Sequence, residues 1–363
     1  MRLAVMAETG GVSMVDSPSG MTRRGLLAAA TAGAAAWPLL RSAPAAAEAQ
    51  QQHAPAVTAP QPLQRDTVRL GVVQLPPAQL GERRGAALER MVATIERAYS
   101  AGQRYDLLWF PADALLPPPE RRSARALLSE AIERDGPERM ALAGWARTYG
   151  CYLGFGARLR APDWPGHVPA ANLLLDPHGQ LVAVHWQARH ARTPQGHAHA
   201  PGVTVVEDVL EAYLERYGAE AVLPVTATPL GNLAMHSVAG EPELLRVLAG
   251  RGCELLLRSA SPGSSRMDAA AGSLHNGIFT AVSGTCDAAP VSSGAPGDVR
   301  ALVFGPRGEL IAQAQTGGPE CVTARLPIAE LRAHRTPSPT SALVAAAAQP
   351  RVLPNRSSSS RAS

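Results

Sequence analysis

The sequence has 363 residues, of which 46% are hydrophobic and 18% charged, so it can supply one large core or two ordinary ones. Its formal net charge of +4 is modest, and basic residues do not form a stripe interleaved with aromatics, which argues against nucleic-acid binding. The 33 Gly and 32 Pro exceed average usage, and we expect unstructured termini around a globular middle.

Residues 1–47 have the layout of an export leader. The pair Arg23-Arg24 precedes a weakly hydrophobic, Ala-rich run that ends near Leu40, and the small residues Ala45–Ala47 follow. This order is similar to a bacterial twin-arginine signal peptide with cleavage after Ala47. We therefore expect an exported protein, periplasmic or secreted.

Two features of this leader qualify the expectation. The start of translation stays open between Met1, Met14 and Met21, because the residues before Met21 lack signal-peptide character. The apolar run is short and interrupted by Pro38, so it is a poor membrane anchor, and we expect no integral membrane span in the mature protein.

The cysteines do not form a recognisable motif. Four are present, Cys151, Cys253, Cys286 and Cys321, and no Cys-x-x-Cys occurs. Four cysteines in an oxidising compartment allow three full pairings, and the spacing does not choose among them. We expect Cys151 and Cys253 to be small buried hydrophobic residues.

The middle of the chain has the periodicity of a layered α/β domain. Residues 48–66 are rich in Ala, Pro and Gln and predict a disordered linker, residues 67–335 form the domain, and residues 336–363 predict a disordered tail. Within the domain, a strand at 68–75, a helix at 82–101, a strand at 106–111, a helix ending near 149 and a strand at 152–156 follow one another. Two similar hairpins come later, with turns at 176–179 and 305–308.

The order of landmarks resembles the nitrilase, or carbon-nitrogen hydrolase, superfamily from about Val68 to Arg335. No single motif carries the resemblance. The landmarks are Gln74 at the end of the first strand, Tyr105–Pro111, the Asn172 hairpin, Pro242–Arg246, Gly252–Leu257, Asn276 and Phe304–Leu310, together with an inserted helix at 206–214 and the segments Pro224-Val225 and Pro229–Leu233.

The resemblance implies a four-layer α-β-β-α sandwich, a homodimer, no cofactor and an active site of Glu, Lys and Cys. In such a site the thiolate attacks an amide or nitrile carbon, the carboxylate transfers protons, and the ammonium stabilises the developing negative charge. The implied ligand is a small amide-like molecule.

The first two positions of this triad carry other residues. The family's Glu normally follows Phe-Pro, where this sequence has Ala112; Asp113 is adjacent but would point to the opposite side of an extended strand end. The family's Lys normally follows the hairpin, where this sequence has Ala188; Arg189 keeps a positive charge nearby, and its reach to the same oxyanion cannot be assumed.

The third position also lacks its residue. Counting forward from Gly231 puts Val238 in the Cys place, although the segment before Pro242 looks shortened and the register is uncertain by a residue or two. Ser237 is then the only hydroxyl candidate. Its neighbour His236 would point to the other face of a strand, so a Ser237–His236 dyad is not expected.

We therefore expect a non-catalytic protein that uses the fold for binding or as a scaffold, because three chemically inert replacements remove the machinery. Two alternatives stay open. A divergent C-N hydrolase would need Asp113, Arg189 and Ser237 around one cleft. A metal-binding protein would use the histidines between 185 and 199, namely His185, His190, His197 and His199, although Pro and Gly around 194–202 predict a loop and no other ligand set is evident.

Overall fold

The computed structural model describes residues 57–119, 122–193, 196–198, 202–237, 239–260, 264–286 and 300–335. All of these residues belong to one compact unit. The leader at 1–47, the linker residues 48–56 and the tail at 336–363 lie outside the described residues, as do Val238 and His199. In the described part of the chain, no helix combines the length and apolarity needed to cross a membrane.

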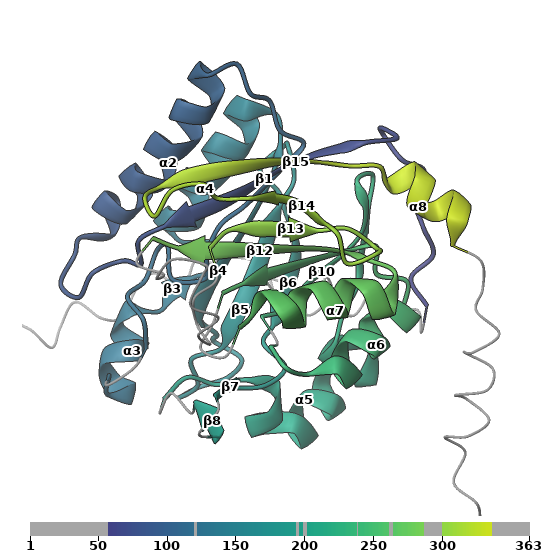
Figure 1. Ribbon diagram of the computed structural model, residues 1–363. Helices are drawn as coiled ribbons and strands as arrows, with labels where there is room; N and C mark the ends of the chain where they lie inside the picture. Colours follow the sequence, from purple (N-terminus) through teal and green to yellow (C-terminus); the bar gives the residue numbers. More distant parts are fainter. Residues whose placement is uncertain are drawn as a thin grey trace, which may run out of the picture. The chain divides into compact units, whose positions relative to one another are not determined.

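One hydrogen-bonded path of strands folds into two halves that face each other (Figure 1). The first half has the order β6-β5-β4-β2-β1-β15, and the second has the order β14-β13-β12-β11-β10-β9. The halves join where β1 runs parallel to β12 for only two residue pairs, Gln74 with Gly284 and Leu75 with Thr285. The strands are β1 (Val68–Leu75), β2 (Leu107–Trp109), β4 (Tyr152–Arg160), β5 (Ala170–Leu175), β6 (Leu181–Trp186), β9 (Thr226–Thr228), β10 (Gly231–Met235), β11 (Leu255–Ser259), β12 (Phe279–Thr285), β13 (Leu302–Phe304), β14 (Leu310–Gln313) and β15 (Glu320–Leu326).

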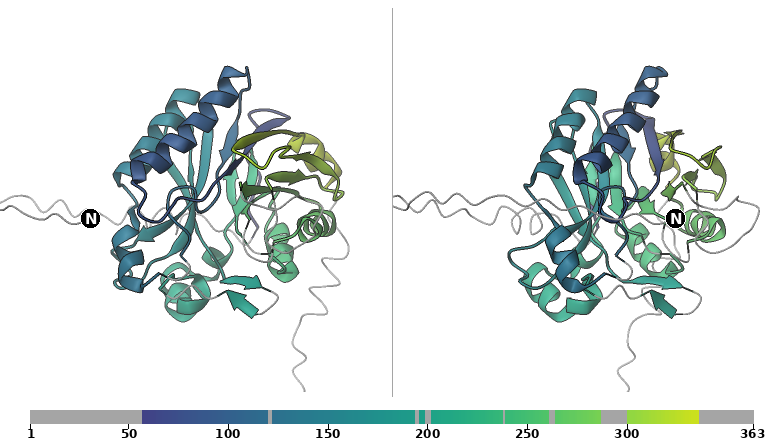
Figure 2. Two further views of the ribbon diagram at one scale, coloured as in Figure 1. Left: turned by 60° about the vertical axis from the view of Figure 1, so that its left-hand side comes forward. Right: turned by 90° about the vertical axis from the view of Figure 1, so that its left-hand side faces the viewer.

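Helices cover the outer face of each half (Figure 2). Helices α2 (Arg84–Ser100) and α4 (Pro137–Tyr149) bury Met91, Ile95 and Leu142 against the first half. Helices α6 (Pro242–Gly250) and α7 (Arg266–Asn276) bury Leu245 and Ala269 against the second half. The fold is therefore a four-layer α-β-β-α sandwich, as the sequence predicts.

Strand alternation assigns each side chain to one layer. On β2, Leu108 packs toward the helices, whereas Leu107 and Trp109 pack between the two sheets. The Trp109 indole N–H donates to the Arg258 carbonyl at 2.6 Å, which ties β2 of one sheet to β11 of the other. Gly154 makes room for this ring, because an added Cβ there would lie 2.7 Å from the indole.

The predicted hairpin at 176–179 is confirmed in detail. The Asp176 carboxylate accepts the His178 N–H at 2.9 Å and the Gln180 N–H at 2.8 Å, and Gly179 supplies the positive φ of 75° that closes the turn. The turn therefore holds β5 and β6 antiparallel, which fixes where the chain leaves β6 and enters the candidate site.

Several boundaries differ from the sequence expectations. The inserted helix at 206–214 is divided into η1 (Val206–Val209) and α5 (Leu210–Tyr217). The expected loop at 194–202 contains part of a short hairpin of β7 (Ala191–Thr193) and β8 (Gly196–Ala198). The remaining elements are α3 (Ala124–Glu130), β3 (Ile132–Glu133), η2 (Ala219–Val222) and α8 (Ile328–His334).

The last ten residues of the expected linker also differ from the sequence expectation. Residues Val57–Asp66, which we call the arm, lie against the folded body, and Thr58 is only 7% exposed. The Gln64 N–H donates to the Pro229 carbonyl at 2.9 Å. The reason is that backbone hydrogen bonds, which composition does not report, hold this Pro- and Gln-rich segment.

Candidate functional site

Polar side chains meet at the carboxyl ends of the parallel strands, where layered α/β folds place their ligand sites. Strands β10, β11 and β12 of the second sheet end there, as do β2 and β4 of the first. Met235, Leu257 and Ala281 point into the core between the sheets. The residues two positions later therefore face the same side.

Those three residues are all serines, and we call Ser237, Ser259 and Ser283 the serine row. The Ser259 N–H donates to Ser237 Oγ at 3.1 Å, and the Ser259 and Ser283 hydroxyl oxygens lie 3.3 Å apart. The Ser283 hydroxyl also lies 3.3 Å from the Arg258 carbonyl. The second sheet thus ends in a line of neutral hydroxyls.

The facing residue from the β6 end is Gln187. Its Oε1 accepts the Ser237 N–H at 3.2 Å. Ala188 points away from this contact, because its side chain is 4% exposed and packs in the apolar cluster with Leu245 of α6. The structure therefore brings Gln187, rather than Ala188, to Ser237.

Ala112 lies on the first sheet's side of the site, in close contact with β4. It is half-buried, and a Cβ added to Gly156 would lie 2.6 Å from the Ala112 Cα and 3.1 Å from Asn172 Oδ1. Asn172 is fully buried, and its Nδ2 donates to the Met235 carbonyl at 2.9 Å. A small residue at 112 and a buried amide at 172 therefore occupy neighbouring positions.

Asp113 belongs to a different contact. Its carboxylate lies 3.6 Å from the guanidinium of Arg158, whose side chain is 6% exposed and also donates to the Pro117 carbonyl at 2.5 Å. The Asp113 carbonyl accepts the Ala78 N–H at 2.9 Å. The carboxylate is thus paired with a buried cation that also anchors the loop after β2.

Arg189 is held by two carboxylates at the rim. Its Nε donates to Glu207 at 2.9 Å and its Nη1 to Glu241 at 3.3 Å. The hydrogen bond to Glu207 raises the pKa of Arg189 above its usual value, and Glu241 adds to this effect. The guanidinium stays charged, and the two carboxylates neutralise its charge. Arg189 therefore connects the segment after β6 with η1 and with the start of α6.

The two described histidine side chains of the 185–199 segment are engaged in hydrogen bonds. The Met235 N–H donates to His185 Nδ1 at 3.2 Å, so the proton lies on Nε2, which donates to Thr226 Oγ1 at 2.8 Å. His190 Nε2 lies 3.0 Å from the Asp208 carboxylate. His197 is on β8, where only its backbone is described. Across the described ranges, no three His, Cys, Asp or Glu side chains gather as a metal site.

His236 is a fully buried imidazole behind the serine row. Its ring stacks on His185 with centroids 5.6 Å apart, and neither of its ring nitrogens has a hydrogen-bond partner in the described structure. Burial lowers the pKa of His236 to about 4, and Arg251 contributes in the same direction. The ring is therefore neutral at physiological pH, and it does not hydrogen bond to Ser237.

Three of the four cysteines lie away from the serine row. All four are free. Cys253 precedes β11, so it is six residues, about 20 Å along an extended strand, from Ser259. Cys151 precedes β4 in the same way, and Cys321 of β15 packs toward the helices. Cys286 follows β12 directly.

The structure thus brings Ala112, Gln187 and Ser237 toward one end of the two sheets, with Asp113 and Arg189 in ion pairs around it. Val238 lies outside the described residues. The sequence identifies Ser237 as a candidate and Asn172 only as a landmark, and it does not single out Gln187, Ser259 or Ser283. Alternation along β6 from Trp186, which packs toward the helices, was the signal that could have identified Gln187.

The family is established by a sequence match that covers most of the described structure. The carbon-nitrogen hydrolase family matches residues 69–336. The chain belongs to the carbon-nitrogen hydrolase family. No curated protein matches the chain in a sequence search.

Solved structures of bacterial amidases share the fold of this carbon-nitrogen hydrolase family member. An amidase from Nesterenkonia sp. is 21% identical, with a TM-score of 0.51 over 75% of this chain and 95% of that chain. A variant of the amidase from Nesterenkonia sp. AN1 in complex with acrylamide is 22% identical over the same shares, also with a TM-score of 0.51. Another variant, with the acetamide moiety of fluoroacetamide added at its active site cysteine, is 20% identical over 79% and 99%, with a TM-score of 0.52.

The composition of this carbon-nitrogen hydrolase family member determines which basic side chain every basic position carries. The sequence contains no lysine, so all 34 residues counted as Lys plus Arg are arginines. Matching the family's Lys position to a residue next to Ala188, such as Gln187, therefore cannot supply an ammonium group either. This signal was present in the sequence and needs no alignment.

Proposed function

We propose that this chain is a non-catalytic member of the carbon-nitrogen hydrolase family that keeps the fold and binds a small amide-like ligand. The observation that carries the proposal is the absence of lysine from all 363 residues. An ammonium is a compact point charge, whereas a guanidinium is planar and larger, so arginine does not replace it in a close-fitting oxyanion site. Hydrolysis by a Glu, Lys and Cys triad then lacks one of its three parts.

Cys253, Cys151 and Asp113 do not supply the other two parts. A thiolate is the required nucleophile, and burial raises the pKa of Cys253 to about 12 and that of Cys151 to about 11. Asp113 is the carboxylate nearest in sequence to Ala112, and it is paired with Arg158. The two thiols are therefore buried and protonated, and the Asp113 carboxylate contacts Arg158.

The candidate site favours uncharged ligands, which supports binding of an amide. Gln187 and the serine row are neutral, and the charged residues at the rim are paired with each other. Hydroxyl and carboxamide groups can donate to a carbonyl and accept from an N–H. The related amidase variant binds acrylamide, so acrylamide and acetamide are the probes to use.

The test measures ammonia release and binding on the same preparation. We expect no hydrolysis of acrylamide or acetamide above buffer, and binding that Gln187→Leu weakens. Gln180→Leu, at an exposed position in the β5–β6 turn, is the matched control and should bind as the wild type does. No binding of either amide would overturn the ligand part of the proposal.

A divergent hydrolase is the second candidate, because Ser237 is half-buried at the site and its Oγ is hydrogen bonded within the serine row. Ammonia release that disappears in Ser237→Ala would establish this candidate and exclude the first. Cys286→Ser is included because Cys286 follows β12 at the same end of the sheet. Loss of activity there would assign the chemistry to that thiol.

We also propose that the protein is exported through the leader at 1–47. The support is the order of Arg23-Arg24, the apolar run and Ala45–Ala47. Expression in a bacterium with a twin-arginine pathway should give a periplasmic chain that begins at Glu48. Arg23→Lys combined with Arg24→Lys should leave the full chain in the cytoplasm, and export of this variant would contradict the proposal.

We further propose a homodimer through the outer faces of α6 and α7. Met267 and Leu274 of α7 are 81% and 53% exposed, and Val247 of α6 is 42% exposed. Met267 and Leu274 are seven residues apart and so lie on one helical face. Light scattering on the wild type should give twice the chain mass, and Met267→Glu should give the monomer. A monomeric wild type would refute the dimer.

A further inference from the structure

The arm lies at the opposite end of the molecule's strands from the candidate site. It runs beside α8 and the β9–β10 hairpin (Figure 1). The Thr58 N–H donates to the Arg251 carbonyl at 3.0 Å, and Thr58 Oγ1 donates to the Val225 carbonyl at 3.2 Å. Near its end, the Asp66 carbonyl accepts the Ala329 N–H of α8 at 3.1 Å.

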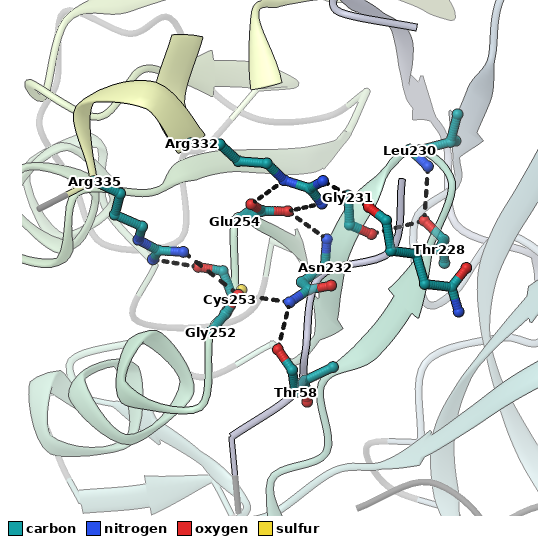
Figure 3. Close-up of polar contacts among 11 residues, drawn as sticks. Thr58, Thr228, Leu230, Gly231, Asn232, Gly252, Cys253, Glu254, Arg332 and Arg335 are labelled. Atoms are coloured by element: carbon teal, nitrogen blue, oxygen red, sulfur yellow. Dashed lines mark hydrogen bonds and ion pairs between the residues drawn. The ribbon is translucent and has the colours of Figure 1, made fainter. Parts of the chain in front are cut away.

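A buried ion pair connects this arm to the body, as Figure 3 shows. Glu254 is 3% exposed and accepts from Arg332 Nε at 2.7 Å and Nη2 at 2.9 Å. The same carboxylate accepts the Asn232 N–H at 2.8 Å. The third nitrogen of the guanidinium, Nη1, donates to the Gln61 carbonyl of the arm at 2.6 Å.

Asn232 of β10 also connects the arm to the body. Its Nδ2 donates to the Thr58 carbonyl at 2.9 Å and to the Gly252 carbonyl at 3.2 Å. Gly252 allows the arm to approach, because it has a φ of 90° and an added Cβ would lie 3.1 Å from the Thr58 oxygen. Arg335, at the end of α8, donates to the Cys253 carbonyl at 2.6 Å.

We propose that the arm and α8 form a latch, in which α8, the last helix of the described residues, fixes the segment that follows the leader. Arg332 is its centre, since one guanidinium contacts the buried Glu254 and the arm together. The relation to the leader depends on the proposed export, whereas the latch itself does not. It is also independent of whether the chain hydrolyses amides.

The contacts of the latch join parts of the chain that are far apart in the sequence. Arg332 and Gln61 are 271 residues apart, and Asn232 and Thr58 are 174 apart. Closing such long loops costs conformational entropy, so these contacts depend on the tertiary fold and not on local structure. The same holds for the pairing of β1 with β15, which joins Val68 and Leu326.

Hydrogen exchange on the full chain tests the latch at single amides. The double variant Arg332→Met/Glu254→Gln removes the contact with Gln61 without leaving a buried charge. We expect exchange at the Thr58 and Gln64 amides to become roughly 10- to 100-fold faster, as the loss of a charge-assisted hydrogen bond allows. The amide of Ala281, in the middle of β12, should keep its wild-type rate.

Two comparisons separate a latch from general weakening. Arg325→Met, at an exposed position of β15, should change none of these rates. Thr58→Val removes the arm's hydroxyl contact and should speed exchange at Ala329 of α8, because coupling between two sites is reciprocal. Unchanged rates at Thr58 and Gln64 in the double variant, or rates that rise in step with Ala281, would overturn the proposal.

Discussion

His236 should make the protein sensitive to mild acid. Its pKa is lowered from 6.5 to about 4, so between these values the unfolded chain binds a proton that the folded chain does not. His236 therefore causes no loss in the free energy of unfolding above pH 6.5, and this free energy decreases as the pH falls toward 4. Linkage over this interval gives a loss of about 2 kcal/mol at pH 5, and about 3 kcal/mol once the pH is well below 4.

Urea unfolding at pH 7.5 and pH 5 measures this loss. Carboxylates titrate in the same range, so the informative quantity is the difference between the wild type and His236→Phe, in which a ring can still stack on His185. Between the two pH values, the free energy of unfolding of the variant should decrease by about 2 kcal/mol less than that of the wild type.

His178→Phe is the control, because His178 is exposed in the β5–β6 turn. It should lose as much stability as the wild type does. If His236→Phe and the wild type also lose equal amounts, the buried neutral ring is not the cause of the acid sensitivity, and the reasoning fails.

Three further predictions follow from close contacts in the interior. Gly156→Ala should lower the free energy of unfolding by about 1–3 kcal/mol in urea titration, because its Cβ would lie 2.6 Å from the Ala112 Cα; an unchanged midpoint would contradict this. Cys253 should react with an aromatic disulfide reagent at pH 8 only after unfolding, since burial raises the pKa of its thiol to about 12; mass spectrometry of the labelled native chain checks this. Asn172→Leu should cost about 1–3 kcal/mol in the same titration by leaving the Met235 carbonyl without its donor.

The sequence predicts the parts of the fold that local chemistry determines. The β5–β6 hairpin follows from Asp176 and Gly179, whose turn contacts span at most four residues. The helix at 206–214 was less accurate, because the chain tightens to a 3-10 turn before Leu210 and composition does not distinguish the two.

The contacts of the candidate site could not be predicted from the sequence. Counting along the family resemblance selects Ala112 and Ala188, whereas the contact between Gln187 and Ser237 joins residues 50 apart. The order of the serine row depends on the register of three strands that come together only in the tertiary fold. The arm was missed for the same reason, since its partners Arg332 and Asn232 are far away in the sequence.

The contact of Trp109 with Arg258 limits how the molecule can admit a ligand. A buried indole that donates across the core to a strand of the opposite sheet holds the spacing of the two layers constant. Entry by separating the sheets would expose this N–H and the apolar cluster around it. For the proposed amide ligand, exchanging one residue at the carboxyl ends, such as Ala112 or Gln187, should therefore change ligand selection without rearranging the layers.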